Sequence, residues 1–271
     1  MRQSQRLREI LRDPRRKWAK SFVALLLSFV AGYVDIVGAL TVYDIFTAHM
    51  TGTTVHLGQQ LIQHNWKAAI IGCTVLATFV FGSIVGRVII EIGSRYSIQR
   101  IGSFTLTLEL VLLAAVIPFG RHVLSPQPFH TAPLVLLCLL LATLAVAMGL
   151  QTATLTRVGA LTVHTTFVTG MLNKLAQLIS HYLFHSFDLW RSAVTLRTTE
   201  LLRQRRDTLR EARFIFSIWL LYLAGATCGT WLSLRWRLES LYLPCCILLL
   251  AVAAEIAQPL SLEEEQDQSE R

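Results

Sequence analysis

Six long hydrophobic stretches lie along the chain, and polar or charged residues are concentrated between them. Crossing the apolar core of a bilayer takes roughly 20 residues of α-helix, and stretches of about 17 residues can suffice. The pattern therefore predicts an all-α polytopic membrane protein with about six transmembrane helices. The expected spans are Ser21–Val42, Ala68–Ile92, Ile101–Phe119, Pro133–Ala153, Phe214–Leu234 and Leu241–Ala257.

The hexapeptide VGALTV occurs twice, at 37–42 and at 158–163, and marks an internal duplication. Each copy is followed by a Thr-Gly pair and then by a hydrophobic stretch with a Gly-x-x-x-Gly spacing. Small residues at this spacing let two transmembrane helices approach closely, so a packing role is expected for these glycines. The pairs are Thr51-Gly52 and Thr169-Gly170, followed by Gly82 with Gly86 and Gly225 with Gly229.

Basic residues distinguish six spans from eight. If the chain starts in the cytoplasm and crosses six times, Arg95, Arg100 and the basic segment 191–213 all fall on the cytoplasmic side, which the positive-inside rule favours. Eight spans would place Arg95 and Arg100 outside. Three spans in each copy make the second copy inverted relative to the first. The sequence thus predicts one transmembrane domain, 21–258, with repeat 1 at about 21–120 and repeat 2 at about 133–258.

The segments that contain the Thr-Gly pairs, Phe46–Ile62 and Phe167–Leu183, are too polar to be ordinary spans. Polar groups at membrane depth must face protein or water. Short glycine-interrupted segments at matching places in two halves are typical of transporter sites. Each segment is therefore expected to be a short re-entrant or broken helix, the two entering from opposite faces. Ordinary short helices buried in the bundle, or full spans, are the alternatives.

Charged residues make up only 15% of the 271 residues, against about 25% in soluble domains, which agrees with a bilayer environment. Basic residues crowd the N-terminal segment 1–20 and the segment 191–213, and both flank spans. Such clusters favour anionic lipid headgroups, rather than nucleic acid, as partners. Segment 191–213 is expected to form a basic helix on the cytoplasmic membrane surface. The acidic tail 259–271 is expected to be disordered, with both termini in the cytoplasm.

Acidic residues lie inside the predicted spans. A charged side chain at the centre of a transmembrane helix costs at least about 2.5 kcal/mol unless it is paired, protonated or hydrated. Asp35 and Glu109 are therefore expected to face the interior and to bind a proton or a cation, with Arg157 a candidate partner for Asp35. Alternatively, Asp35 reaches the membrane interface and Glu109 simply bonds a neighbouring helix. Glu255, near the end of its span, is expected to lie at the interface.

The Thr-Gly segments carry the other candidate site residues. Thr51 and Thr169 are suited to begin helices, and Gly52 and Gly170 behind them would let a ligand approach the free backbone N–H groups. A helix start of this kind attracts anions, and a plain capping role also explains the same residues. Amide side chains on the following turns are expected to line a polar path: Gln59, Asn173 and Gln177.

Metal sites, cofactors and catalytic motifs are not predicted. The cysteines lie inside hydrophobic stretches without a Cys-x-x-Cys spacing. His181 and His185 have the spacing of a helical metal pair, but the sequence offers no obvious third ligand. A Ser-His-Asp order, a phosphate loop and a His-Glu-x-x-His motif are absent from the sequence, which disfavours an enzyme.

Three sequence stretches resemble the YoaK-type bacterial membrane proteins, a family defined as a domain of unknown function. They are AGYVDIVGAL, FTAHMTGTTVHLG and MGLQTATLTRVGALTVHTTFVTGML. The resemblance covers nearly everything from Ser21 to Ala257 and implies a bacterial inner-membrane protein of about six spans, without a known substrate or cofactor. The chain departs from the family pattern at Thr53 and His164, where Asn and Arg are common.

Together these observations favour a transporter-like or channel-like protein for a small polar or anionic solute, with its site between the two repeats. A membrane-embedded enzyme or lipid-modifying protein that uses His49, His56 or Asp35 is one alternative, and a non-catalytic membrane assembly factor is another. The sequence leaves the oligomeric state open.

Overall fold

The computed structural model describes residues 14–41, 45–96, 98, 100–124, 132–154, 157–158, 161–162, 166–191 and 195–257, and it describes the backbone alone at 14–17, 121–124, 157–158, 161–162, 191 and 195–199. The predicted basic residues 1–13, the acidic tail 259–271 and His164 lie outside the described residues. The elements in chain order are α2 (Pro14–Thr41), α3 (Met50–Ile62), α4 (Trp66–Arg95), α5 (Ile101–Leu124), α6 (Leu134–Thr154), β1 (Arg157–Val158), β2 (Leu161–Thr162), α7 (Val168–Arg191), α8 (Thr195–Trp236), the 3-10 helix η2 (Arg237–Leu241) and α9 (Tyr242–Ala257).

Helices form nearly all of the described chain, apart from the antiparallel pairing of β1 with β2. Five helical stretches among the described residues are long and apolar enough to cross a membrane. The first four lie in α2, α4, α5 and α6, where the first four spans are predicted. The fifth, Glu200–Ala257, turns at η2 and holds both remaining predicted spans, in the second half of α8 and in α9. The prediction of an all-α polytopic membrane protein is confirmed.

The two Thr-Gly segments form helices of unequal length. α3 has 13 residues and ends in a polar turn, where His64 adopts a left-handed backbone conformation with φ 55° and the side chain of Asn65 caps α4. α7 has 24 residues and continues past Leu183 to Arg191, so it is longer than the short helix expected. The added residues contain no glycine or proline to end a helix, which explains the extension.

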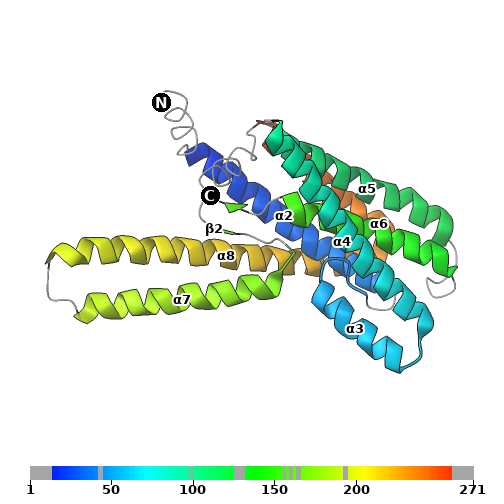
Figure 1. The fold of residues 1–271 in the computed structure, drawn as a ribbon, viewed down its shortest axis with the longest axis horizontal. Coiled ribbons are helices and arrows are strands. Elements are labelled where there is room, and N and C mark those ends of the chain that lie inside the picture. The colour runs from blue at the N-terminus through cyan, green and yellow to red at the C-terminus, as the bar shows by residue number, and fades with distance from the viewer. Residues whose placement is uncertain are drawn as a thin grey trace.

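α7 and α8 form a long antiparallel hairpin that extends away from the rest of the bundle (Figure 1). Arg205 of α8 donates a hydrogen bond of 2.8 Å to the hydroxyl of Tyr182 on α7, and its guanidinium carbon lies 5.0 Å from the centre of that ring. The basic segment expected to form a separate surface helix is instead the first half of α8, continuous with the fifth predicted span. Its leucines, arginines and glutamates are good helix formers, and none of them interrupts the helix.

Two close helix pairs join the first half of the chain to the second. α2 packs along α8, and α4 packs along α6. A methyl group added at Gly225 would lie 2.1 Å from the carbonyl oxygen of Phe29, and one added at Gly82 would lie 2.4 Å from that of Val146. Glycine has no side chain, so the two backbones can touch at these positions, and any larger residue would push the helices apart. The other two glycines of the predicted pairs, Gly86 and Gly229, lie at the same two contacts.

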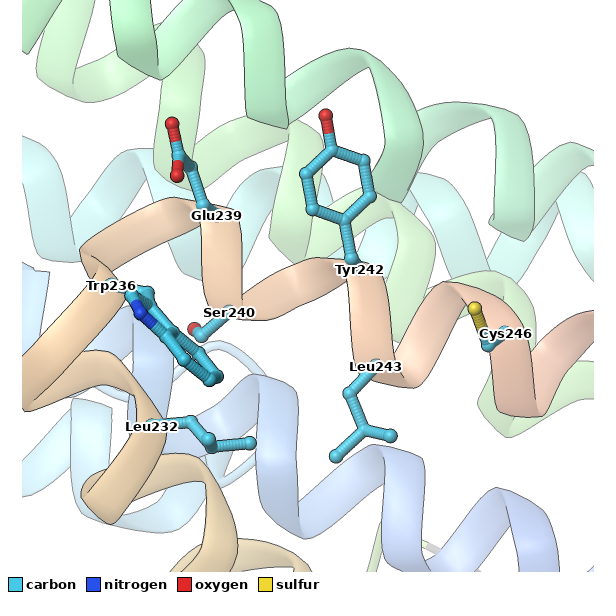
Figure 2. Close-up of a pocket in the computed structure, with 7 residues that line it drawn as sticks. All are labelled: Leu232, Trp236, Glu239, Ser240, Tyr242, Leu243 and Cys246. Atoms are coloured by element: carbon cyan, nitrogen blue, oxygen red, sulfur yellow. The ribbon is translucent and has the colours of Figure 1, made fainter.

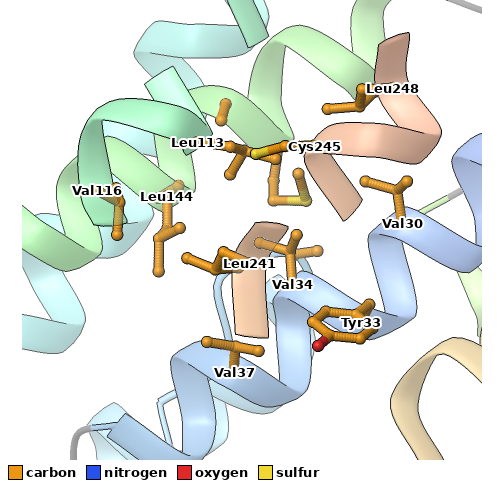
Figure 3. Close-up of a cluster of buried hydrophobic side chains, with 14 of the residues drawn as sticks. Val30, Tyr33, Val34, Val37, Leu113, Val116, Leu144, Leu241, Cys245 and Leu248 are labelled. Carbon is orange, nitrogen blue, oxygen red and sulfur yellow. The ribbon is translucent and has the colours of Figure 1, made fainter. Parts of the chain in front are cut away.

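Side chains from α2, α5, α6, η2 and α9 form a central core (Figure 3). Val34 of α2, Leu113 of α5 and Leu248 of α9 are all enclosed there. The Tyr33 hydroxyl donates a hydrogen bond of 2.8 Å to the carbonyl oxygen of Ser240, which ties α2 to η2. Lipid is as apolar as these side chains, so close packing and such hydrogen bonds, rather than escape from water, hold the helices together.

Candidate functional site

Asp35 lies in the second half of α2 and is 3% exposed, so it faces the protein interior and not the membrane interface. Its Oδ1 accepts hydrogen bonds from the backbone N–H groups of Ala48 (2.7 Å) and His49 (3.2 Å). Its Oδ2 accepts a hydrogen bond of 2.7 Å from the Tyr222 hydroxyl of α8. One carboxyl group thus ties α2 both to α8 and to the segment that leads into α3.

The segment before α3 is held by further bonds. Thr53 is fully buried, and its hydroxyl donates a hydrogen bond of 2.7 Å to the carbonyl oxygen of Phe46. This is the position where the family that the chain resembles commonly has asparagine. Thr47 is also fully buried, and its methyl group lies against Gly38 of α2. The start of α3 therefore has a fixed position relative to α2.

The two Thr-Gly segments, although far apart in the sequence, line a single cavity of about 350 Å³. Residues at the start of α3 form one part of the wall, and residues at the start of α7 form another. Phe79 of α4 and Thr152 of α6 complete it. The lining residues are Ala48, His49, Met50, Thr51, Phe79, Thr152, Thr166, Phe167, Val168 and Thr169.

Hydroxyl groups, one imidazole and two helix starts supply the polar part of this cavity. The Oγ1 atoms of Thr152 and Thr166 are hydrogen-bonded to each other at 2.8 Å. The first turn of a helix leaves N–H groups unpaired and carries a partial positive charge. The described lining contains no acidic side chain, and Met50 and Phe79 contribute apolar surface. The cavity therefore suits a small polar or negatively charged molecule with some apolar surface.

Several predicted site residues lie away from this cavity. Gln59 on α3 and Asn173 and Gln177 on α7 are exposed, and they do not contribute to its lining. Arg157 lies in β1, and its side chain is not among those described, so its pairing with Asp35 stays a prediction.

The glycines of the two Thr-Gly pairs directly follow, in the sequence, the threonines of the cavity wall. A methyl group at Gly52 would lie 3.3 Å from the ring of Phe46, and one at Gly170 would lie 2.1 Å from the ring of Phe167. Larger residues at either position would displace an aromatic ring beside the cavity.

Two more acids face the contact between α5 and α9. Glu109 is fully buried, and neither of its carboxyl oxygens has a hydrogen-bond partner among the described residues. Glu255, which is expected near the membrane interface, is also fully buried within the protein. The Ser103 hydroxyl donates a hydrogen bond to Glu255, and Gly102 leaves room for its carboxyl group. Neither acid lines the cavity.

Sequence reasoning missed Tyr222, Phe79 and Thr152. A lone tyrosine in an apolar span needs a partner for its hydroxyl, and this signal could have linked Tyr222 to Asp35. Phe79 and Thr152 lie in stretches with the pattern of ordinary packed helices. The contact of α4 with α6 brings Phe79 and Thr152 to the cavity, and this contact cannot be predicted from the sequence around either residue.

A second hollow, of about 410 Å³, lies where α8 turns through η2 into α9 (Figure 2). Leu232 and Trp236 from the end of α8 and Leu243 from α9 give it largely apolar walls. Arg237 makes the turn with a left-handed backbone, φ 49°. This hollow contains none of the residues that the duplication singles out, so the cavity between the Thr-Gly segments is the stronger candidate site.

Within the described ranges, no group of three histidine, cysteine, aspartate or glutamate side chains could hold a metal ion. His181 and His185 lie next to each other on α7, with ring centres 6.5 Å apart. The cysteines are free thiols.

Apolar helices around a packed interior, with a cavity between two helix starts, define a polytopic helical membrane protein. Over residues 23–254 the chain matches the family described as "Protein of unknown function (DUF1275)", and it belongs to that family. It is 29% identical over 161 residues to the UPF0700 transmembrane protein YoaK of Bacillus subtilis (strain 168), which covers 59% of this chain and 67% of that protein. The predicted resemblance is confirmed. No solved structure matches the chain.

Proposed function

We propose that the protein carries or conducts a small polar or anionic solute across the bilayer, and that the solute binds in the cavity between the starts of α3 and α7. The observation that carries this proposal is the convergence of two repeated Thr-Gly segments on one hollow, among helices able to cross a membrane. Secondary transporters commonly bind their substrates at such an interface between repeats. Because the matched relative is bacterial, we place the protein in the bacterial inner membrane. The distribution of basic residues favours both termini in the cytoplasm.

Matched glycine contacts support a two-fold relation between the two halves. In each close helix pair, both helices contribute a glycine, and each glycine touches the carbonyl oxygen of the residue three positions before the partner's glycine. The contacts are Gly32 with Tyr222 and Gly225 with Phe29 in α2 and α8, and Gly149 with Phe79 and Gly82 with Val146 in α4 and α6. Together with the order of the helices in the two proposed repeats, the same construction in both pairs supports α6 as the counterpart of α2, and α8 as the counterpart of α4.

This correspondence makes Thr152 the counterpart of Asp35, since each lies three residues after the glycine of its helix. Alignment by the VGALTV copies alone would pair Asp35 with Thr156, one helical turn away. The two side chains have matching tasks. Asp35 binds the backbone of Ala48, three residues before Thr51, and Thr152 binds Thr166, three residues before Thr169. Each half therefore holds the start of the helix that carries its Thr-Gly pair at the cavity.

The directions of α5 and α9 support an inverted repeat. Both follow the third helix of their half. Ser103 near the start of α5 bonds Glu255 near the end of α9, and Glu109 farther along α5 interacts electrostatically with Cys245 near the start of α9. The two helices thus run antiparallel. Equivalent helices run in the same direction across a bilayer in a parallel repeat and in opposite directions in an inverted one.

The inverted arrangement can be tested by labelling single cysteines in intact cells, in a background from which the native cysteines are removed. Tyr96→Cys, Arg206→Cys and Gln63→Cys place the label at exposed positions. A membrane-impermeant maleimide is expected to reach position 63 from outside and positions 96 and 206 only after the cells are opened. External labelling at 96 together with protection at 63 would instead support eight spans and contradict the inverted repeat.

Binding at the cavity can be tested by thermal unfolding of the purified protein with short-chain carboxylates, inorganic anions and neutral polyols. A ligand at about 100 times its Kd stabilises a protein by about 2.7 kcal/mol, which is readily measured. We expect at least one anion to raise the Tm, and Thr51→Val and Thr169→Val each to remove most of that rise.

Thr54→Val is the matched control for this experiment. Thr54 lies on the exposed side of α3, outside the cavity lining, and its hydroxyl donates a hydrogen bond of 2.8 Å to the Met50 carbonyl oxygen of its own helix. A Tm rise that survives in both cavity variants, or that is lost equally in Thr54→Val, would count against this site.

The enzyme alternative gains less support from this geometry. Of the three residues considered for it, only His49 lines the cavity. The carboxyl group of Asp35 is already engaged by three donors, which leaves little freedom for acid–base chemistry.

A further inference from the structure

Glu109 is the most unusual buried group in the described part of the chain. It lies in the middle of the apolar stretch of α5, it is fully buried, and neither oxygen finds a donor among the described residues. An ionised carboxylate in such a place loses its hydration without compensation. A metal cation would need several oxygen ligands, and the described surroundings of Glu109 do not supply them.

A line of polar groups leads along α5 toward Glu109 from the start of the helix. Ser103 lies in the first turn of α5, shortly after the exposed Arg100, and it bonds the buried carboxyl group of Glu255 on α9. Thr105, fully buried, follows and shares a hydrogen bond of 3.0 Å with Thr154 of α6. Glu109 lies one turn beyond Thr105, about 9 Å deeper along the axis than Ser103.

We propose that Glu109 is a proton-binding site of the membrane domain, and that protons reach it from the start of α5 by way of Glu255. The site is separate from the solute cavity, whose lining includes neither acid. Its use as the coupling site for solute movement rests on the proposed function, whereas proton binding itself does not.

The surroundings of Glu109 favour a proton over any other partner. Cys245 of α9 is a titratable group that interacts with Glu109, and neither carboxyl oxygen of Glu109 has a hydrogen-bond partner within the described chain. A neutral thiol neither neutralises a carboxylate nor binds a hard cation. Binding a proton removes the charge without any further ligand.

Infrared difference spectroscopy on the purified full-length protein tests this proposal without any solute. We expect a carbonyl band of a protonated carboxyl group at neutral pH, and we expect Glu109→Gln to remove it. In Glu255→Gln the band should persist. On transfer to deuterium oxide, the band shifts as deuterium replaces the proton on Glu109, and this exchange should be about tenfold slower because the proton route through Glu255 is interrupted. An unchanged band in Glu109→Gln would overturn the site, and an unchanged exchange rate in Glu255→Gln would overturn the route.

Labelling of the unmodified protein with dicyclohexylcarbodiimide gives a second test that does not depend on the folding of a variant. This apolar reagent attacks protonated carboxyl groups within the membrane, and peptide mass spectrometry identifies the modified residue. We expect modification at Glu109, decreasing as the pH is raised. Labelling that spares Glu109 at every pH would overturn proton binding there, and a failed solute screen would leave this result unaffected.

Discussion

Asp35→Ala is expected to lower the free energy of unfolding by at least about 3 kcal/mol, because each buried donor that loses its acceptor costs about 1–3 kcal/mol. The substitution leaves the backbone N–H groups of Ala48 and His49 and the Tyr222 hydroxyl without their acceptor, in a place that water does not easily reach. The measurement is thermal unfolding of the detergent-purified protein. The segment before α3 should also become more accessible to protease.

Two milder variants separate the bonds of this carboxyl group. Asp35→Asn keeps an oxygen that can accept from both backbone N–H groups, and Tyr222→Phe removes only the bond to α8. Each is expected to cost about 1–2 kcal/mol. Equal losses in Asp35→Ala and Asp35→Asn would show that the bonds to the backbone contribute little, contrary to this account.

Gly225→Ala is expected to reduce the yield of folded protein strongly, with a loss of stability of at least about 1–3 kcal/mol. The added methyl group would lie 2.1 Å from the carbonyl oxygen of Phe29, so α2 and α8 would have to separate. Gly82→Ala, which meets the carbonyl oxygen of Val146 at 2.4 Å, should behave alike. Size-exclusion profiles and the Tm of each purified variant give the comparison.

Gly58→Ala is the matched control, since it makes the same chemical change within a helix. A methyl group at Gly58 meets no atom within 4 Å, and alanine favours a helix over glycine by up to about 1 kcal/mol. Stability should therefore stay the same or rise. If Gly225→Ala proved as harmless as Gly58→Ala, the close approach of α2 and α8 would be contradicted.

The positions of the helices could be predicted from the sequence because a bilayer imposes a simple length and polarity on every span. The first four apolar stretches coincide with α2, α4, α5 and α6. The lengths of α7 and α8 could not be predicted in this way, because their outer halves are amphipathic or charged and are stabilised by each other. The bond between Arg205 and Tyr182 is part of that pairing.

The duplication directed attention to Thr51 and Thr169, and the structure places both in the lining of one cavity. Their neighbours there were not foreseeable, because Phe79 and Thr152 come from helices that meet only in the folded protein. The burial of Glu255 was missed for a related reason. Its place depends on the space that Gly102 leaves on a neighbouring helix, and the position of Glu255 near the end of the chain's last span gives no sign of it.

The pairing of α2 with α8 also has a consequence for how the protein is made. Phe29 and Gly225, which touch in the folded protein, are separated by 196 residues in the chain. At about 5–20 residues per second, the ribosome delivers the second of them roughly 10–40 s after the first. During that interval α2 has entered the bilayer without its partner, and Asp35 has only Ala48 and His49 to bond. The first helix of the nascent chain must therefore stay in lipid or in the insertion machinery without this partner until α8 has been made.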